Sequence, residues 1–108
     1  MGQSSRIVVT FEGSTLVISP SGEIDHHSAR SLRDRIDNEM YSNRPSVMIL
    51  DLSGIDFMDS SGLGLLLGRY QRAMEIGCEM KLAGCSARTM RILELAGADK
   101  LFQFAEKV

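Results

Sequence analysis

The stretch that decides the fold runs from Val47 to Gly77 and reads "VMILDLSGIDFMDSSGLGLLLGRYQRAMEIG". Residues Val47–Leu52 predict a strand, and the unbroken apolar run from Val47 to Leu50 favours a central strand buried on both faces. A polar loop follows, and leucines with helical spacing then predict a helix that ends at Gly77. A strand, a loop and a helix in this order are typical of an α/β fold. The predicted apolar stripe of the helix consists of Leu63, Leu66, Leu67, Tyr70 and Met74.

A hairpin and another helix are predicted on the N-terminal side of this stretch. Two runs rich in β-branched residues, Arg6–Glu12 and Thr15–Ser19, are separated by Gly-Ser, a pair typical of a β-hairpin. Polar residues from Asp25 to Ser28 then offer candidate helix caps. The helix that follows has one apolar stripe, formed by Ala29, Leu32, Ile36 and Met40.

The C-terminal part of the chain predicts a short strand over 79–84, a helix over 86–97 and a last short strand. Ser86 is the expected cap of that helix, and Gly97 its end. The predicted order is therefore ββαβαβαβ, which implies a mixed sheet of about five strands with helices packed against it. We expect one domain over residues 1–108, with 1–5 and 106–108 as frayed ends.

Composition and charge exclude several classes of protein. With 12 basic and 14 acidic residues the net charge is −2, and both signs are interspersed, so we expect no nucleic-acid surface. No apolar run approaches the roughly 20 residues of a membrane helix, and no secretory signal is evident, so we expect a cytoplasmic protein. Cys78 and Cys85 have neither CxxC spacing nor a neighbouring His, which indicates reduced core thiols. We expect neither a metal nor another cofactor.

Asp59, Ser60 and Ser61 stand where the loop enters the leucine-rich helix. Ser and Asp cap helices by accepting hydrogen bonds from free backbone N–H groups, which explains one of the three residues. A spare hydroxyl has a further use, because a helix N-terminus tolerates the roughly −2 charge that a phosphate brings. Asp56 and Asp59 already make this surface acidic, so an added phosphate would repel a docked partner. The residues alone leave a plain cap and a phosphorylation switch both open.

The glycines of the same helix only partly match a nucleotide-binding motif. Gly62, Gly64 and Gly68 give G-x-G-x-x-x-G, which is one residue longer than the dinucleotide fingerprint and does not directly follow the strand. We expect these glycines to be small positions where the helix lies close to the sheet. The chain lacks G-x-x-x-x-G-K-[ST], so we expect no ATP-driven kinase activity of its own.

Two enzymatic alternatives would use the polar residues differently. A serine hydrolase could combine Ser60 with an imidazole from the pair His26-His27 and the aspartate before it, but the G-x-S-x-G elbow is missing. A receiver-type phosphoacceptor at Asp51 would need further carboxylates to hold Mg²⁺, and the N-terminal half has no acidic pair at a strand end. A turn or capping role explains the histidine pair more simply, so we expect no enzymatic activity.

Three blocks of the sequence resemble a known family. "LDLSGIDFMDSSGLGLLLGRY" resembles the signature of the anti-sigma factor antagonists, whose fold is the STAS domain (sulphate transporter and anti-sigma antagonist). "SGEIDHHSARSL" resembles the segment after the first hairpin in the sporulation branch of that family, and "GCSARTMRILELAGADKLFQF" resembles its last helix and strand. The likeness covers nearly the whole chain, and Asp-His-His and Leu-Gly-Arg-Tyr point to the sporulation branch.

The resemblance implies a role in partner switching. In the family, the serine after the motif's aspartate, here Ser60, is phosphorylated by the anti-sigma factor, which is an ATP-dependent serine kinase. The unphosphorylated antagonist binds this kinase and frees the sigma factor, phosphorylation ends the binding, and a serine phosphatase restores it. An alternative within the same fold is a general-stress sigma pathway. The residues that match the family's docking corner are Asp25, Asp59, Ser61, Gly62 and Leu63.

Overall fold

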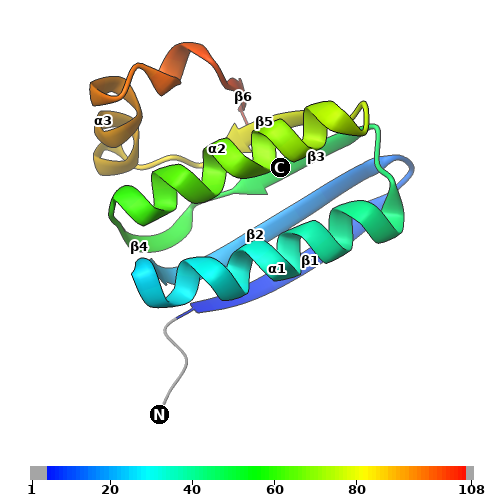
Figure 1. The fold of residues 1–108 in the computed structure, drawn as a ribbon, viewed down its shortest axis with the longest axis horizontal. Coiled ribbons are helices and arrows are strands. Elements are labelled where there is room, and N and C mark those ends of the chain that lie inside the picture. The colour runs from blue at the N-terminus through cyan, green and yellow to red at the C-terminus, as the bar shows by residue number, and fades with distance from the viewer. Residues whose placement is uncertain (1–4, 107–108) are drawn as a thin grey trace.

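The structure, a computed structural model, describes residues 5–106 and shows three α-helices and six strands in that range (Figure 1). The expectation of frayed ends falls mostly on residues 1–4, 107 and 108, which lie outside the described part. The strands are β1 (Ser5–Glu12), β2 (Thr15–Ile24), β3 (Val47–Asp51), β4 (Gly54–Met58), β5 (Glu79–Ala83) and β6 (Gln103–Ala105). The helices are α1 (His26–Asn43), α2 (Ser60–Glu75) and α3 (Ala87–Leu95), followed by a 3-10 turn, η1 (Ala98–Lys100).

The strand that organises the sheet is β2. It pairs antiparallel with β1, and it pairs in parallel with β3 through its first half and with β4 through its second half. The sheet continues in parallel from β3 to β5 and from β5 to β6. The predicted mixed sheet is therefore confirmed, with six strands in place of about five.

The additional strand, β4, lies in the segment that we expected to be a loop. Gly54 and Asp56 interrupt its apolar pattern, so the segment itself carries little signal for a strand. Its pairing depends on an extension of β2, which runs to Ile24 instead of ending at Ser19. Strand β4 is the sixth strand of a sheet for which we predicted about five, and it pairs with this extension of β2.

The pairing of β2 with β4 places two helix starts side by side. Ile24 and Met58 are partners in register, and each is the last residue of its strand. The backbone N–H of Asp59 donates to the carbonyl of Ile24 at 3.2 Å. Helices α1 and α2 therefore begin next to each other and run alongside one another (Figure 1).

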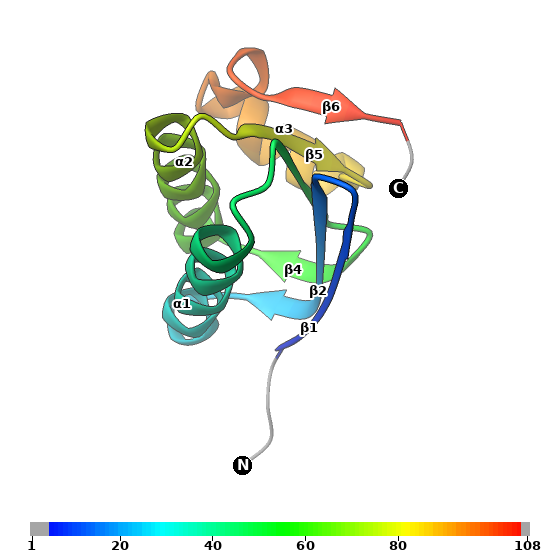
Figure 2. The ribbon, with the colours of Figure 1, turned by 90° about the vertical axis from the view of Figure 1, so that its right-hand side faces the viewer.

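One face of the sheet is covered by α1 and α2 (Figure 2). Strand β3 accordingly alternates, with Met48 and Leu50 buried and Val47 and Ile49 partly exposed. The prediction that this strand is buried on both faces is wrong, because α1 and α2 pack only on the side of Met48 and Leu50. The largest fully buried side chains are Leu16, Ile18, Ile24, Ile36, Met40, Met48, Leu50, Leu66, Leu82 and Leu93.

The buried face of α2 is rotated from the predicted stripe. Leu66 is fully buried as expected, but Met74 is 63% exposed, so its place in the stripe was wrong. The face also includes residues outside the predicted stripe, among them Leu65 and the arginine Arg69, which a hydrophobic pattern does not select. The buried residues of the helix are Gly62, Leu65, Leu66, Arg69 and Ala73.

The three glycines of α2 differ in their surroundings. A Cβ atom on Gly62 would lie 2.1 Å from Met58 Cγ and 3.3 Å from Ile24 Cγ2, so this position has to be small. The corresponding positions on Gly64 and Gly68 have no neighbouring atom within 4 Å. Close packing explains Gly62 as predicted, and it is the wrong explanation for Gly64 and Gly68.

The two cysteines are free thiols in packed positions. Cys78 is buried and Cys85 partly buried. Burial raises the pKa of both thiols, that of Cys85 to about 11. Both are therefore protonated at neutral pH and weak nucleophiles, which fits the expected role as small packing residues.

Candidate functional site at the starts of α1 and α2

Helix α2 begins with a cap supplied by Asp59. Oδ1 of Asp59 accepts a hydrogen bond from the backbone N–H of Ser61 at 2.7 Å, and its carbonyl accepts one from the N–H of Gly62 at 3.0 Å. Ser60 is the first residue of the helix and is exposed. The sequence left three candidates for the cap, and the structure gives the role to Asp59. The hydroxyl of Ser60 is therefore not needed to cap the helix.

Helix α1 begins with a reciprocal cap. Oδ1 of Asp25 accepts hydrogen bonds from the backbone N–H groups of His27 and Ser28, both at 2.9 Å. In return, the hydroxyl of Ser28 accepts from the backbone N–H of Asp25 at 3.0 Å and donates to the carbonyl of Glu23 at 2.8 Å. The hydrogen bonds to the carboxylate, above all the one from the backbone N–H of Ser28, hold the pKa of Asp25 below its ordinary value.

The structure brings four of the predicted site residues into one corner. The two strands that precede α1 and α2 end at Ile24 and Met58, which are partners in register, so the two helices start side by side. Gly62 is instead buried beneath Met58, and Leu63 is partly buried against the core. Gly62 therefore affects the surface through the close packing that it allows, whereas Leu63 keeps part of its side chain exposed. The four residues in the corner are Asp25, Asp59, Ser60 and Ser61.

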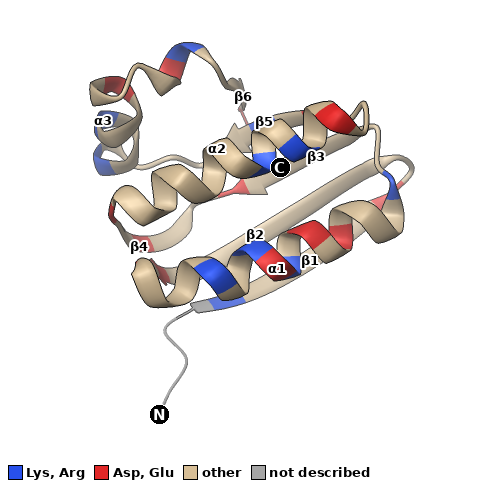
Figure 3. Ribbon diagram, in the orientation of Figure 1, with Lys and Arg blue, Asp and Glu red and all other residues tan. Residues whose placement is uncertain are grey.

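Acidic and aromatic side chains surround this corner. Asp56 and Phe57 on β4 are exposed, Phe57 to 41%. Figure 3 shows acidic residues on β4 and at the start of α2. Exposed aromatic rings often anchor protein interfaces. We did not single out Phe57 in the sequence, because an aromatic residue in a predicted loop carries no signal of which way its ring faces.

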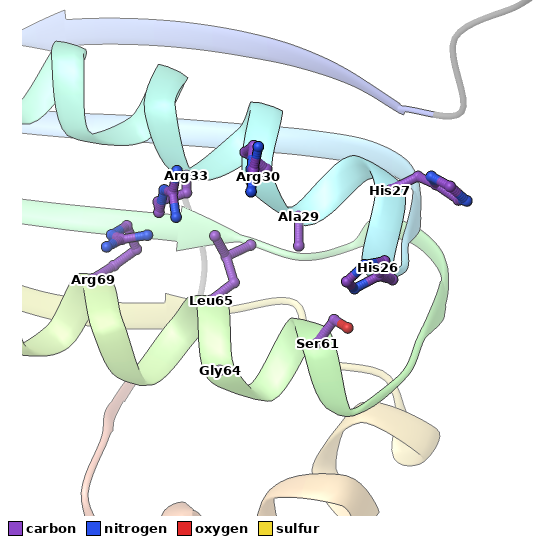
Figure 4. Close-up of a pocket in the computed structure, with 9 residues that line it drawn as sticks. All are labelled: His26, His27, Ala29, Arg30, Arg33, Ser61, Gly64, Leu65 and Arg69. Atoms are coloured by element: carbon purple, nitrogen blue, oxygen red, sulfur yellow. The ribbon is translucent and has the colours of Figure 1, made fainter.

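A groove of about 590 Å³ lies between α1 and α2, next to the corner (Figure 4). Arg33 from α1 and Arg69 from α2 point toward one another, and His26 faces Ser61 (Figure 4). The sequence did not predict this groove, because nothing in the local pattern says that these two helices lie side by side. Its basic lining residues are His26, His27, Arg30, Arg33 and Arg69.

Arg69 is a buried arginine, with 4% of its surface exposed. Its Nε lies 2.8 Å from Oδ1 of Asp37 on α1, but the N–H does not point at that oxygen, so the contact is an ion pair without a hydrogen bond. Burial lowers the pKa of Arg69 and raises that of Asp37, while the attraction between the two charges opposes both shifts. The guanidinium is therefore held in place by charge, with its hydrogen-bonding capacity only partly used.

Other kinds of site find little support here. Among residues 5–106, no group of three or more His, Cys, Asp and Glu side chains could hold a metal ion. A hydrolase would need an imidazole directed at Ser60, whereas His26 lies opposite Ser61 (Figure 4). No helix in the described part of the chain has both the length and the hydropathy to cross a membrane.

Comparisons with known proteins agree with one another. The family model of the STAS domain matches residues 6–108. An anti-sigma F factor antagonist from Paenibacillus polymyxa is 35% identical over 86 residues, which cover 80% of this chain and 74% of that protein. An anti-sigma-B factor antagonist from Listeria monocytogenes is 29% identical over 84 residues, which cover 77% of this chain and 72% of that protein.

A solved structure shows the same fold in two chemical states. The Bacillus anti-sigma factor antagonist SpoIIAA is 25% identical to this chain, and its unphosphorylated form matches with a TM-score of 0.78 over 94% of this chain and 89% of that one. Its phosphorylated form matches with a TM-score of 0.72 over 94% and 92%. The predicted fold and family are thereby confirmed, and the chain belongs to the STAS domain family and, within it, to the anti-sigma factor antagonists.

Proposed function

We propose that this chain binds an anti-sigma factor while Ser60 carries a free hydroxyl, and thereby releases the sigma factor that the anti-sigma factor holds. The anti-sigma factor is also the kinase. It transfers the γ-phosphoryl group of ATP to the hydroxyl oxygen of Ser60, ADP leaves, and the complex dissociates. A serine phosphatase hydrolyses the phosphate and returns the chain to its binding state. The cycle takes place in the cytoplasm, and this chain is its substrate and binder rather than an enzyme.

The observation that carries this proposal is the division of roles at the start of α2. Asp59 caps the helix, so the exposed hydroxyl of Ser60 is free to be modified. The N-terminus of a helix favours negative charge, because its free N–H groups and its dipole point toward it. A phosphate on Ser60 is therefore compatible with the folded domain.

The phosphate acts on the complex through charge. It brings about −1.5 to −2 charges to a corner that already holds the carboxylates of Asp25 and Asp59, with Asp56 on the adjoining strand β4. A partner seated there would have to desolvate these groups together, and a loss of about 4 kcal/mol lowers affinity roughly a thousandfold. The fold stays the same while the binding changes.

The docking corner that we propose has two kinds of contributor. Asp25, Asp59 and Ser61 offer polar groups at the surface, although Oδ1 of both carboxylates is engaged in capping. Gly62 and Leu63 contribute the shape beneath, since Gly62 lets the helix approach Met58 closely. An anti-sigma factor would contact the first set and fit the second.

The pathway that we propose is sporulation, on the resemblance of the segment around Asp25, "EIDHHS", to that branch. The relatives named above include antagonists of both anti-sigma F and anti-sigma-B factors, so a general-stress pathway is the second candidate. Capture of the unphosphorylated chain by a sigma-F-type anti-sigma factor in preference to a sigma-B-type one is the expected result. The reverse preference would assign the chain to the stress pathway.

The experiment is a phosphorylation assay followed by intact-mass measurement. Incubation with ATP and the anti-sigma factor should add one phosphate to the parent chain and none to Ser60→Ala. Ser61→Ala is the matched control and should accept the phosphate. Loss of the phosphate in Ser61→Ala alone would move the site, and absence of both phosphate and complex with every anti-sigma factor tried would contradict the proposal. Ester hydrolysis lost in both Ser60→Ala and His26→Ala would support the hydrolase alternative instead.

A further inference from the structure

The groove between α1 and α2 gathers positive charge on a chain whose net charge is −2. Arg30 and Arg33 lie one turn apart on α1, and Arg69 faces them from α2 (Figure 4). None of the described residues that line the groove is acidic. The groove is therefore a positive strip on a slightly negative protein.

Nearby carboxylates offset only part of this charge. Arg33 pairs with Asp34 at 3.2 Å, but both side chains are exposed, and exposed pairs of this kind are weak. Arg69 pairs with Asp37 without forming a hydrogen bond. Arg30 is exposed and makes no ion pair with any described residue. Unpaired positive charge therefore remains at Arg30, while the charges of Arg33 and Arg69 are partly offset by Asp34 and Asp37.

Arg69 gives the most specific sign of a ligand. It is buried and borders the groove, and its Nε lies 2.8 Å from Oδ1 of Asp37 without the geometry of a hydrogen bond. The ion pair leaves part of the guanidinium's hydrogen-bonding capacity unused, and a planar guanidinium matches a carboxylate with two parallel hydrogen bonds. Arg33 points toward the same place (Figure 4), and a negative group between two guanidinium groups relieves their mutual repulsion.

The shape of the groove fits a short extended segment better than a compact ion. From Ser61 to Arg69 the helix rises about 12 Å, which matches about four residues of extended chain. Ala29 and Leu65 provide apolar surface between the charged side chains. A peptide segment with acidic residues and one apolar side chain would use both parts.

The groove is continuous with the docking corner. Ser61 belongs to both, and His26 at the end of the groove follows Asp25 directly. A partner seated over Ser60 would therefore also cover the mouth of the groove. Because the corner is acidic and the groove is basic, that partner needs the opposite order of charges on its own surface.

We propose that the groove between α1 and α2 binds an acidic segment of the anti-sigma factor, whose carboxylates contact Arg30 and Arg69. This inference rests on the function proposed above. The corner then carries the switch, and the groove supplies affinity and orientation.

The first test uses a peptide and needs no partner protein. The ¹⁵N-labelled full chain is titrated with an acetylated, amidated hexaglutamate peptide up to about 1 mM, with hexaglutamine as the neutral control. The expected result is a set of shifts at the amides of His26, Arg30, Ser61 and Leu65 and at the Nε–H of Arg69. Arg30→Glu should abolish these shifts, and Arg91→Glu, an exposed position on α3, should leave them unchanged.

Three outcomes of this titration would overturn the proposal. One is the absence of shifts in the groove. Another is equal loss of binding in Arg30→Glu and Arg91→Glu, which would indicate attraction to the whole surface. The third is inorganic phosphate producing the same shifts at the same concentration, which would indicate a site for a compact anion.

The second test uses the anti-sigma factor and separates the two proposals. Arg30→Glu should weaken the complex of the unphosphorylated chain about tenfold, and Arg91→Glu should change its affinity less than twofold. If Arg30→Glu binds like the parent while Ser60→Asp still loses binding, the groove proposal fails and the switch stands. If the hexaglutamate peptide binds as expected while Ser60→Asp binds the anti-sigma factor like the parent, the proposed switch fails.

Discussion

Helices α1 and α2 begin with the same kind of four-residue motif, an aspartate cap and the first three helical residues, but the last residue of the motif differs. Each follows the last residue of a strand, each is capped by an aspartate, and the two strands are parallel neighbours in register. At α1 the fourth residue of the motif is Ser28, whose hydroxyl closes the cap by bonding back to Asp25 and Glu23. At α2 the same position is Gly62, and the serines are the second and third residues of the motif, where Ser60 is exposed and Ser61 partly exposed. The hydroxyl of Ser28, at the fourth position, stabilises the cap, whereas the hydroxyl of Ser60, at the second position, is accessible to solvent.

The largest expected effect tests whether only the second start is a switch. Ser60→Asp should lower affinity for the anti-sigma factor about a hundredfold. The new carboxylate would be buried in the complex beside other carboxylates, which is unfavourable, but its single charge repels them less than a phosphate dianion does. His26→Gln, at the matching position of α1, should change affinity less than fivefold. Isothermal titration of the unphosphorylated variants measures both. Equal losses in the two variants would mean that both starts are equivalent parts of one interface.

The next effect concerns the glycine that replaces Ser28 in the second motif. Gly62→Ala should lower the free energy of unfolding by about 1–3 kcal/mol, because the new methyl group overlaps Met58. Gly64→Ala is the matched control, since nothing lies near its Cβ, and should raise stability by up to about 1 kcal/mol through helix propensity. Urea unfolding of both variants gives the comparison. An equally stable Gly62→Ala would show that Met58 repacks freely.

The hydroxyl of Ser28 should contribute more to stability than that of Ser61. Ser28→Ala leaves the backbone N–H of Asp25 and the carbonyl of Glu23 without this buried partner, so we expect a loss of about 1–2 kcal/mol. Ser61 contributes its backbone N–H to the cap, so Ser61→Ala should stay within about 0.5 kcal/mol of the parent. Thermal unfolding at pH 7 measures both variants. A large loss in Ser61→Ala would contradict the contrast between the two starts.

The smallest effect is a dependence of stability on acid. The pKa of Asp25 lies below its ordinary value of 3.8 in the folded chain, so the cap is at full strength above pH 3.8 and weakens as the pH falls through the folded value. Asp25→Asn keeps a capping side chain without the charge. Its melting temperature should therefore fall less between pH 5 and pH 3 than that of the parent. Identical acid dependence in the two chains would show that the carboxylate of Asp25 gains nothing from its cap.

Much of this fold could be predicted because its signals are local. Ser86 caps α3 by accepting from the N–H of Thr89, as its position in the sequence indicated. Gly77 follows the end of α2 with φ of +74°, a conformation that glycine adopts most readily. Caps, stops and hairpins are decided by neighbouring residues, so a single sequence is enough to place them.

The features that escaped prediction depend on contacts between distant segments. Strand β4 pairs with β2, and it contains Gly54 and Asp56, residues that strands disfavour. Arg69 is buried because Asp37 on another helix faces it, which no helical periodicity reveals. The basic groove needs both helices in place before its charges add up. The residues of the proposed switch could be selected from the sequence because they form a local motif, whereas the basic groove depends on how two distant helices pack.

The hydrogen bond from the N–H of Asp59 to the carbonyl of Ile24 makes the proposed phosphorylation site, Ser60, part of a folded surface rather than a linear motif. A synthetic peptide covering only Phe57 to Tyr70 has neither the partner strand nor enough length to hold a helix in water. A kinase that recognises the corner would ignore such a peptide and any unfolded copy of the chain. If Ser60 is the phosphorylation site that we propose, only correctly folded molecules would be phosphorylated.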